Sequence, residues 1–349
     1  MNQRAAVTVT LWAAATALIL LGQAHAARAA TPAVAPLGRP SAAGPAPTTH
    51  YAFGAAYPEG GFCEQKVFGR RPVIAEPINV IFSLTALLLG GLGVFRSRRT
   101  TMAFQFLYGL LAAYGLFAAL YHATLMNGLY RMKDVAISMV QSFIIIMLFH
   151  SLYLYRVKQR GREAGRGYRL LVAVMTLLFT AYPAAVHVAG ESSANPWVSW
   201  LVFDLLWILI GAQLILIWRR RRTWPKTPPD APVFRLVWFA LGAVVLAYAG
   251  WSADTFLCSA ETPALAYLCL HGVWHLCMGL SFYQLITLSR FFSAHEYGFE
   301  PVLERIPLVG FLRLPFVEWR SRRDVGGLEC MQTEVPVATR LRPTSPKET

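Results

Sequence analysis

The chain has 349 residues, of which 56% are hydrophobic and 14% charged, and its formal net charge is +14. Soluble domains carry about a quarter charged residues, so this composition excludes an ordinary soluble protein and indicates an integral membrane protein. The positive charge does not point to nucleic acid, because the arginines gather in short clusters between apolar runs, as in the cytoplasmic loops of membrane proteins.

The N-terminal residues 1–26 have the pattern of a signal peptide, with an early arginine, an apolar core and small residues at Ala24 and Ala26. The apolar core is short for a spanning helix, which favours cleavage over an uncleaved first span. Both alternatives place the following residues outside the cytoplasm. Residues 27–60 are rich in alanine and proline and are expected to form a disordered linker.

Seven apolar runs of roughly 20 residues, the length that spans a bilayer, follow the linker. Backbone polar groups cannot stay unpaired in lipid, so each run is predicted as a transmembrane helix. We therefore predict an all-α membrane protein, a seven-transmembrane helix bundle over residues 61–292, with a basic cytoplasmic tail at 293–349. The predicted spans are, in chain order, 77–95, 102–122, 135–155, 170–189, 197–218, 236–256 and 266–291.

The charges of the loops predict the orientation of this bundle. The loops after the fourth and sixth spans carry Glu191 and Glu261 and no lysine or arginine. Arg131 and Lys133, after the second span, are an exception to the pattern. Because positive residues favour the cytoplasmic side, we expect the N-terminus outside and the C-terminus inside. The arginine clusters that support this orientation follow the first, third and fifth spans, at residues 96–99, 156–169 and 219–222.

The last predicted span carries two histidines and no lysine, which excludes a retinal Schiff base. His271 and His275 are four residues apart, so both rings project from the same helical face. This spacing lets two imidazoles bind one cation at about 2.0–2.1 Å. A catalytic zinc takes three protein ligands and a water, and His122 at the end of the second span is the natural third. The alternative is that the histidines make hydrogen bonds between helices.

Ionisable residues inside a span are costly and are functional hypotheses by default. In the predicted orientation the three histidines lie toward the outer leaflet. Polar residues scattered for structural reasons would not be expected to choose one side so consistently. The acidic residues predicted on the same side are Glu76, Asp134, Asp204 and Asp254.

The tail after residue 292 lies outside the predicted bundle. Within it, residues 303–319 (LERIPLVGFLRLPFVEW) are predicted as an amphipathic helix on the inner membrane surface. The prolines of this segment count against a regular helix.

Four segments in order resemble the alkaline ceramidases, a family of seven-span membrane hydrolases. The similarity covers residues 62–290, and the tail lies outside it. All four segments fall at the membrane depth that the family requires. They are FCEQKVFGRRPVIAEPIN at 62–79, GLFAALYHATL at 115–125 followed by Asp134, WSADTFLC at 251–258 and HGVWH at 271–275.

The resemblance implies a Zn²⁺ site formed by His122, His271 and His275. It also implies that Asp134 assists the water that attacks the substrate. The residues expected to support this site or the fold around it are Glu64, Glu76, Asn79, Tyr121 and Asp254.

The resemblance further implies a disulfide between Cys63 and Cys258, both outside in the predicted topology, where oxidation is possible. The alternative is two free cysteines acting as small apolar side chains. Some animal members hold calcium next to this segment, but the matching positions here are Gly61 and Lys66. We therefore expect no calcium site.

Two departures from the family affect the expected chemistry. The family has a serine one helical turn before the first histidine, where this chain has Ala118, so one transition-state donor is missing. Tyr121 and Tyr114 are candidate replacements. In addition, Asp134 lies one residue later after His122 than in the family.

The residues and the resemblance together predict a zinc-dependent membrane hydrolase that cleaves the amide bond of an N-acyl lipid such as ceramide, with a zinc-activated water. One alternative is a zinc-containing seven-span receptor-like or binding protein, which the missing serine favours. Another is a lipid esterase, since esters and amides need the same water and oxyanion support. The expected partners are a membrane lipid and the bilayer, and the expected location is a bacterial-type inner membrane, with the metal toward the outer leaflet.

Overall fold

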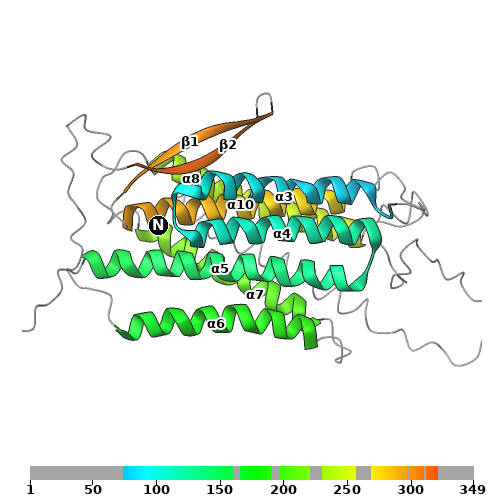
Figure 1. Ribbon diagram of the computed structural model, residues 1–349, viewed down its shortest axis with the longest axis horizontal. Helices are drawn as coiled ribbons and strands as arrows, with labels where there is room; N and C mark the ends of the chain where they lie inside the picture. Colours follow the sequence, from blue (N-terminus) through cyan, green and yellow to red (C-terminus); the bar gives the residue numbers. More distant parts are fainter. Residues whose placement is uncertain are drawn as a thin grey trace, which may run out of the picture.

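The computed structural model is nearly all helical. It describes residues 74–159, 166–189, 197–220, 230–256, 269–296, 299–309 and 312–320. Figure 1 shows α3, α4, α5 and α6 lying side by side, with α10 next to α3 and α4. The helices in these residues are α3 (Pro77–Arg96), α4 (Met102–Thr124), α5 (Asn127–Gln159), α6 (Arg166–Ala189), α7 (Trp197–Arg220), α8 (Asp230–Phe256) and α10 (Leu270–Glu296).

Four helices in the described residues are long and apolar enough to cross a membrane. This supports the prediction of a helical membrane protein. Each of the first six predicted spans falls inside one helix, and the seventh overlaps α10, which begins at Leu270. The four apolar stretches are Pro77–Arg96, Met102–Thr124, Gly128–Ser151 and Arg235–Asp254.

The connection between α4 and α5 is shorter than the sequence predicted. α4 ends at Thr124 and is capped by Leu125, whose φ of 56° is left-handed and whose backbone N–H donates to the Tyr121 carbonyl. α5 then begins at Asn127. Lys133 and Asp134 therefore lie on the second turn of α5. Arg131 and Lys133, the two exceptions to the loop-charge pattern, are thus helical residues and not loop residues.

α3 and α4 approach each other closely because glycines face the contact. A Cβ atom added to Gly115 on α4 would stand 2.8 Å from the carbonyl carbon of Ala86, and closer still to the Leu87 nitrogen. Neither neighbour is a flexible side chain, so the backbones themselves would have to separate. Small residues at helix contacts are the usual means of packing in membranes.

Replacing Gly115 with alanine is therefore expected to destabilise the protein by about 1–3 kcal/mol, the usual cost of overpacking. The measurement is thermal unfolding of detergent-purified protein. Gly109→Ala on the same helix is the control, because an added Cβ there meets nothing within 4 Å. Equal unfolding temperatures for the two variants would contradict the close packing of α3 on α4.

α10 is the central helix of the described bundle, packed against α3, α4, α5 and α8. Met278, Phe282, Ile286 and Leu288 on this helix have no exposed surface. A helix that is buried on all sides must place its polar residues inside the protein. Its two histidines therefore face other helices.

The predicted amphipathic helix at residues 303–319 is wrong. The chain there forms an antiparallel hairpin of β1 (Glu300–Val309) and β2 (Leu312–Arg320), seen beside α10 in Figure 1. β1 carries two prolines and β2 one; proline breaks a helix but is tolerated in edge strands. Leu314, Phe316 and Val317 are buried.

A buried arginine fixes the hairpin to the C-terminal part of α10. The Arg290 guanidinium donates to the Ser97 hydroxyl at 2.6 Å and lies 4.3 Å from the centre of the Phe316 ring. The Trp319 indole donates to the Arg290 carbonyl at 3.2 Å. The hairpin thus closes the end of the bundle that is opposite the two histidines of α10.

Candidate metal centre

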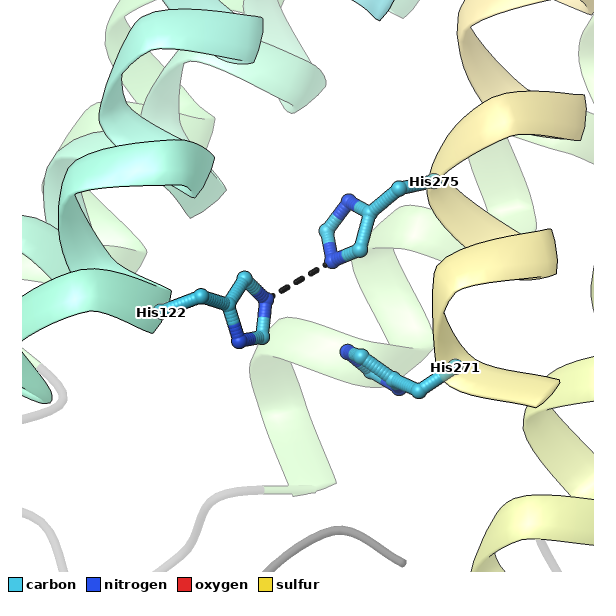
Figure 2. Close-up of side chains that lie close together, drawn as sticks. All are labelled: His122, His271 and His275. Carbon is cyan, nitrogen blue, oxygen red and sulfur yellow. Dashed lines mark hydrogen bonds between the residues drawn. The ribbon is translucent and has the colours of Figure 1, made fainter. Parts of the chain in front are cut away.

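Three buried histidines from two helices meet at one point. His122 lies on the last turn of α4, and His271 and His275 lie on the first two turns of α10. Each offers one nitrogen, and these atoms all lie within 4.8 Å of one another. Figure 2 shows the ring of His122 facing the other two across the space between the helices. The Nε2 atoms of His122 and His275 are 2.8 Å apart.

The backbone brings a carboxylate to the same place. The N–H of Glu76 donates to the His122 carbonyl at 3.0 Å, and the N–H of Ala75 donates to the Ala123 carbonyl at 3.2 Å. These bonds satisfy carbonyls at the end of α4 that have no partner within the helix. They also place the Glu76 side chain directly beside the imidazole of His122.

The Glu76 carboxyl group contacts Nδ1 of His122, the ring nitrogen that does not face the other histidines. Its Oε2 is 2.5 Å from His122 Nδ1, and both side chains are fully buried. Burial raises the pKa of the Glu76 carboxyl to about 8, while a hydrogen bond from Asn79 and the charge of Lys133 act in the opposite direction. In its ionised form, which a nearby cation would favour, Glu76 accepts the Nδ1–H of the ring, and the Nε2 lone pair of His122 is then aimed at the centre.

The Tyr114 hydroxyl contacts Nδ1 of His275, the ring nitrogen that does not face His122. Its hydroxyl is 3.0 Å from His275 Nδ1, and both groups are buried. Tyr114 stands one helical turn before Ala118, the position where the family serine is replaced. Its hydroxyl therefore supports a histidine, which is a different task from stabilising an oxyanion. Tyr121 lies edge-on to the His122 ring, with 4.9 Å between the ring centroids.

The donor set fits a divalent cation. When Glu76 and Tyr114 each accept a proton from Nδ1, two Nε2 lone pairs face each other at 2.8 Å, which is repulsive unless a positive charge lies between them. The same two rings are also satisfied without an ion, if His275 Nε2–H donates to His122. The third imidazole, His271, lies edge-on to both rings, with centroid distances of 5.1 Å to His122 and 4.9 Å to His275. Three histidines are a usual ligand set for catalytic zinc.

Asp134 forms an ion pair next to this centre. Its Oδ1 is 3.2 Å from Lys133 Nζ, and the two side chains are 20% and 12% exposed. The Lys133 ammonium also lies 4.3 Å from the centre of the Tyr130 ring and 5.3 Å from that of Tyr121. Because Tyr121 packs on His122, the Lys133–Asp134 pair stands at the same end of the bundle as the histidines.

The remaining predicted residues are placed as follows. Asp254 is buried near the end of α8, and Asn79 donates to Glu76 Oε2 at 3.2 Å. Cys269 and Cys277 are free thiols. Glu64 and both cysteines of the predicted disulfide, Cys63 and Cys258, lie outside the described residues, as do Gly61 and Lys66.

Comparison with known protein families gives one match. A family model described as Ceramidase matches residues 59–310, which is most of the chain. The chain belongs to the ceramidase family. The match includes every described helix and β1, and it ends before β2. A search of curated proteins found no match to this ceramidase-family chain.

The sequence alone did not show the contacts that Lys133 and Tyr114 make near the three histidines of this ceramidase-family chain. Lys133 was considered only as an exception in the loop charges, because α5 was expected to begin after it. The asparagine at residue 127, a residue common at helix starts, was the available signal. Tyr114 was named only as a replacement for the missing serine. Its spacing of eight residues from His122 puts both on neighbouring faces of α4, but sequence cannot show which ligand it contacts.

Replacing Glu76 with glutamine is expected to weaken metal binding by about 10–100-fold, the usual effect of losing a carboxylate behind a histidine ligand. The shape of the side chain is kept, so the fold should survive. Zinc affinity is measured by competition with a chelator. Glu304→Gln is the control, since that carboxylate pairs with Arg320 on the hairpin at 2.7 Å. An unchanged affinity in the Glu76 variant would show that Glu76 supports the fold only.

Proposed function

We propose that this protein is a zinc-dependent membrane hydrolase that cleaves the amide bond of an N-acyl lipid. The observation that carries the proposal is the meeting of three buried imidazoles, two of them held from behind by Glu76 and Tyr114. Membership of the ceramidase family supports an amide-bearing lipid as the substrate. The apolar helices around the site support a substrate that arrives from the bilayer.

The proposed topology has seven spanning helices, with the N-terminus outside and the C-terminus in the cytoplasm of a bacterial-type cell. Residues 1–26 are a signal peptide, 27–60 a linker, and 61–292 the catalytic bundle. The cytoplasmic tail begins at residue 293 and contains the hairpin. The metal centre then lies toward the outer leaflet of the inner membrane, because the ends of α4 and α10 that carry the histidines are on that side.

His122, His271 and His275 would hold the zinc ion. When bound, the ion supplies a Lewis acid that polarises an amide carbonyl and lowers the pKa of a water molecule. Glu76 and Tyr114 keep the tautomer and the orientation of two of the rings, so that their Nε2 atoms stay directed at the centre.

Asp134 acts as the general base and then as the general acid. As the water oxygen bonds to the carbonyl carbon, the Asp134 carboxylate takes the water's proton. It then gives that proton to the nitrogen as the carbon–nitrogen bond breaks, which releases a fatty acid and an amine. Lys133, paired with Asp134 at 3.2 Å, holds the carboxylate in position at the edge of the site.

The test is hydrolysis by detergent-purified protein of defined N-acyl lipids, followed as release of fatty acid. Chelator treatment should abolish the activity and added zinc should restore it. An ester with the same acyl chain, assayed in parallel, separates an amidase from an esterase. If zinc-loaded protein releases no fatty acid from any of these lipids, the hydrolase proposal is wrong.

One observation favours a second candidate, a binding or receptor-like protein that keeps its metal for structure. Ala118 is fully buried and carries no hydroxyl, and Tyr114 is already engaged with a histidine. The site then has one oxyanion donor fewer than its relatives. Such a protein would bind N-acyl lipid and zinc and would release no product.

A further inference from the structure

The ammonium group of Lys133 lies beside the candidate metal centre and is almost buried. Lys133 is on the second turn of α5, and its side chain is 12% exposed. Its Nζ donates to Asp134 Oδ1 at 3.2 Å. An ammonium group carries three N–H donors, and the ion pair with Asp134 uses one of them. Lys133 can therefore hold Asp134 in position and donate to a second acceptor at the same time.

Two tyrosine rings fix the position of this ammonium. It lies 4.3 Å from the centre of the Tyr130 ring and 5.3 Å from that of Tyr121. Both rings belong to a small apolar cluster around the turn between α4 and α5, in which Leu125 is buried. A cation is attracted to aromatic rings at these distances, and rings that are packed in a cluster stay in place. The positive charge is thus held at the site before a substrate arrives.

Tyr121 connects the ammonium to the metal centre. Its ring lies edge-on to that of His122, with 4.9 Å between the centroids, so one side chain separates Lys133 from a candidate ligand. The charge of Lys133 acts on Glu76 and on all three imidazoles of the centre. The charge of Asp134 acts on Tyr114, which contacts His275. The ion pair is therefore within electrostatic reach of the whole centre.

A lysine in this position opposes the binding of a metal ion. Two positive charges repel each other, and the repulsion is stronger inside a helix bundle than in water. A protein that held zinc only for structure would bind it more tightly with a neutral residue at this position. Residues that conflict with one local requirement are expected at functional sites, where they meet another. The fixed charge of Lys133 therefore suits an anion that forms during the reaction.

Hydrolysis of an amide creates such an anion, and one hydrogen-bond donor for it is missing. Ala118 is fully buried and has no hydroxyl, at the position where the family has a serine. The Tyr114 hydroxyl is 3.0 Å from His275 Nδ1 and is engaged there. Hydrogen bonds from a charged donor are roughly twice as strong as those between neutral groups, so an ammonium is a suitable replacement for a hydroxyl.

We propose that Lys133 stabilises the oxyanion of the tetrahedral intermediate, in place of the hydroxyl that Ala118 lacks. As the water oxygen bonds to the carbonyl carbon, one electron pair of the C=O bond moves onto the carbonyl oxygen, and an N–H of Lys133 donates to it. When the carbon–nitrogen bond breaks, that pair re-forms the C=O bond, and Lys133 keeps its proton throughout. The inference rests on the proposed function and adds the group that stabilises its developing charge.

The experiment measures binding of an anionic analogue, without turnover. The probe is a long-chain phosphonamidate, in which a tetrahedral phosphorus with a negatively charged oxygen replaces the amide carbonyl. Its affinity for detergent-purified, zinc-loaded protein is measured by calorimetry. Lys133→Met keeps the apolar stem and removes the charge, so the affinity should fall by about 10²-fold, the usual loss for one oxyanion donor. Lys133→Arg keeps the charge and should stay within about tenfold of the wild type. Lys133→Gln serves if Lys133→Met does not fold.

The same comparison in an Asp134→Asn background separates a direct contact from an effect through Asp134. Removing the lysine frees no carboxylate in this background, and the affinity should still fall by about 10²-fold. A loss that requires Asp134, or no loss at all, would overturn the inference. Zinc affinity is a second readout, because removing a like charge should leave Lys133→Met binding zinc at least as tightly as the wild type. Weaker zinc binding would show that Lys133 builds the site and would also overturn the inference.

Arg131→Met is the matched control. It removes the same charge from the same turn of α5, on another face of the helix, and should keep the wild-type affinity for the phosphonamidate. In Asp134→Asn protein, whose turnover should be low, the corresponding amide gives a reference affinity. If this protein binds the phosphonamidate no more tightly than the amide, the proposed function fails. If it prefers the phosphonamidate equally with and without the Lys133 substitution, only the present inference fails.

Discussion

Replacing His275 with alanine is expected to remove the bound metal. Wild-type protein should carry about one zinc per chain, as expected for a three-histidine site, and the variant close to none. His275 contacts both His122 and Tyr114. Its loss leaves His122 and His271 as the remaining candidate ligands, and His122 loses the ring that faces its Nε2. Zinc at a hundred times its dissociation constant stabilises a folded protein by about 2.7 kcal/mol, and the variant should lose this stabilisation.

The measurement is the metal content of detergent-purified protein, together with the unfolding temperature with and without added zinc. His150→Ala is the control. That histidine is on α5, with its Nδ1 2.5 Å from the Tyr168 hydroxyl, and it belongs to no metal cluster in the described residues. His150→Ala should keep the zinc. If folded wild-type protein contains none, the three histidines are hydrogen-bonding residues between helices and the hydrolase proposal fails with the site.

The helices of this protein were predictable because lipid leaves the backbone few choices. A long apolar run must satisfy its own hydrogen bonds, so α3 and α4 follow from hydropathy alone. The shared face of His271 and His275 was equally predictable, since four residues make just over one helical turn. The identity of their third partner came from the family resemblance and from depth in the membrane.

The residues behind the histidines were harder to assign, because their partners are far away in sequence. Glu76 lies 46 residues from His122, and Tyr114 lies 161 from His275. Helical periodicity shows which face a side chain occupies and says nothing about what lies opposite. The same limit applies to Asp204, whose depth was recognised, and to Tyr248 on α8, whose hydroxyl donates to Asp204 at 2.7 Å and which was not considered.

The hairpin was mispredicted for a different reason. Residues 303–319 combine apolar residues, charges of both signs and two prolines, a composition that is compatible with a surface helix, an edge strand or a loop. The partner that decides between them is the buried arginine on α10, whose charge is accommodated by Ser97 and Phe316. Such a tertiary contact overrides local propensity, and the sequence of the hairpin itself does not predict a contact with Arg290.

Replacing Asp134 with asparagine is expected to lower the turnover of an N-acyl lipid by about 10²–10⁴-fold, the usual contribution of a general acid–base group. Asparagine keeps the size of the side chain but cannot accept the water's proton. Since Asp134 pairs with Lys133 and is not among the three clustered ligands, zinc content should stay at the wild-type level. The measurements are fatty-acid release under saturating substrate and metal analysis of the same sample.

The Asp134 variant also separates the two candidate functions. A binding protein that holds zinc for structure would show the same lipid affinity with either residue, and no product from either. A hydrolase would bind the lipid as before and lose only its rate. Glu318→Gln on the hairpin is the control, because it neutralises a carboxylate that lies 3.5 Å from Arg320 at the other end of the bundle. If Asp134→Asn keeps the wild-type turnover, Asp134 is not the general base, and another group near the three histidines must accept the water's proton.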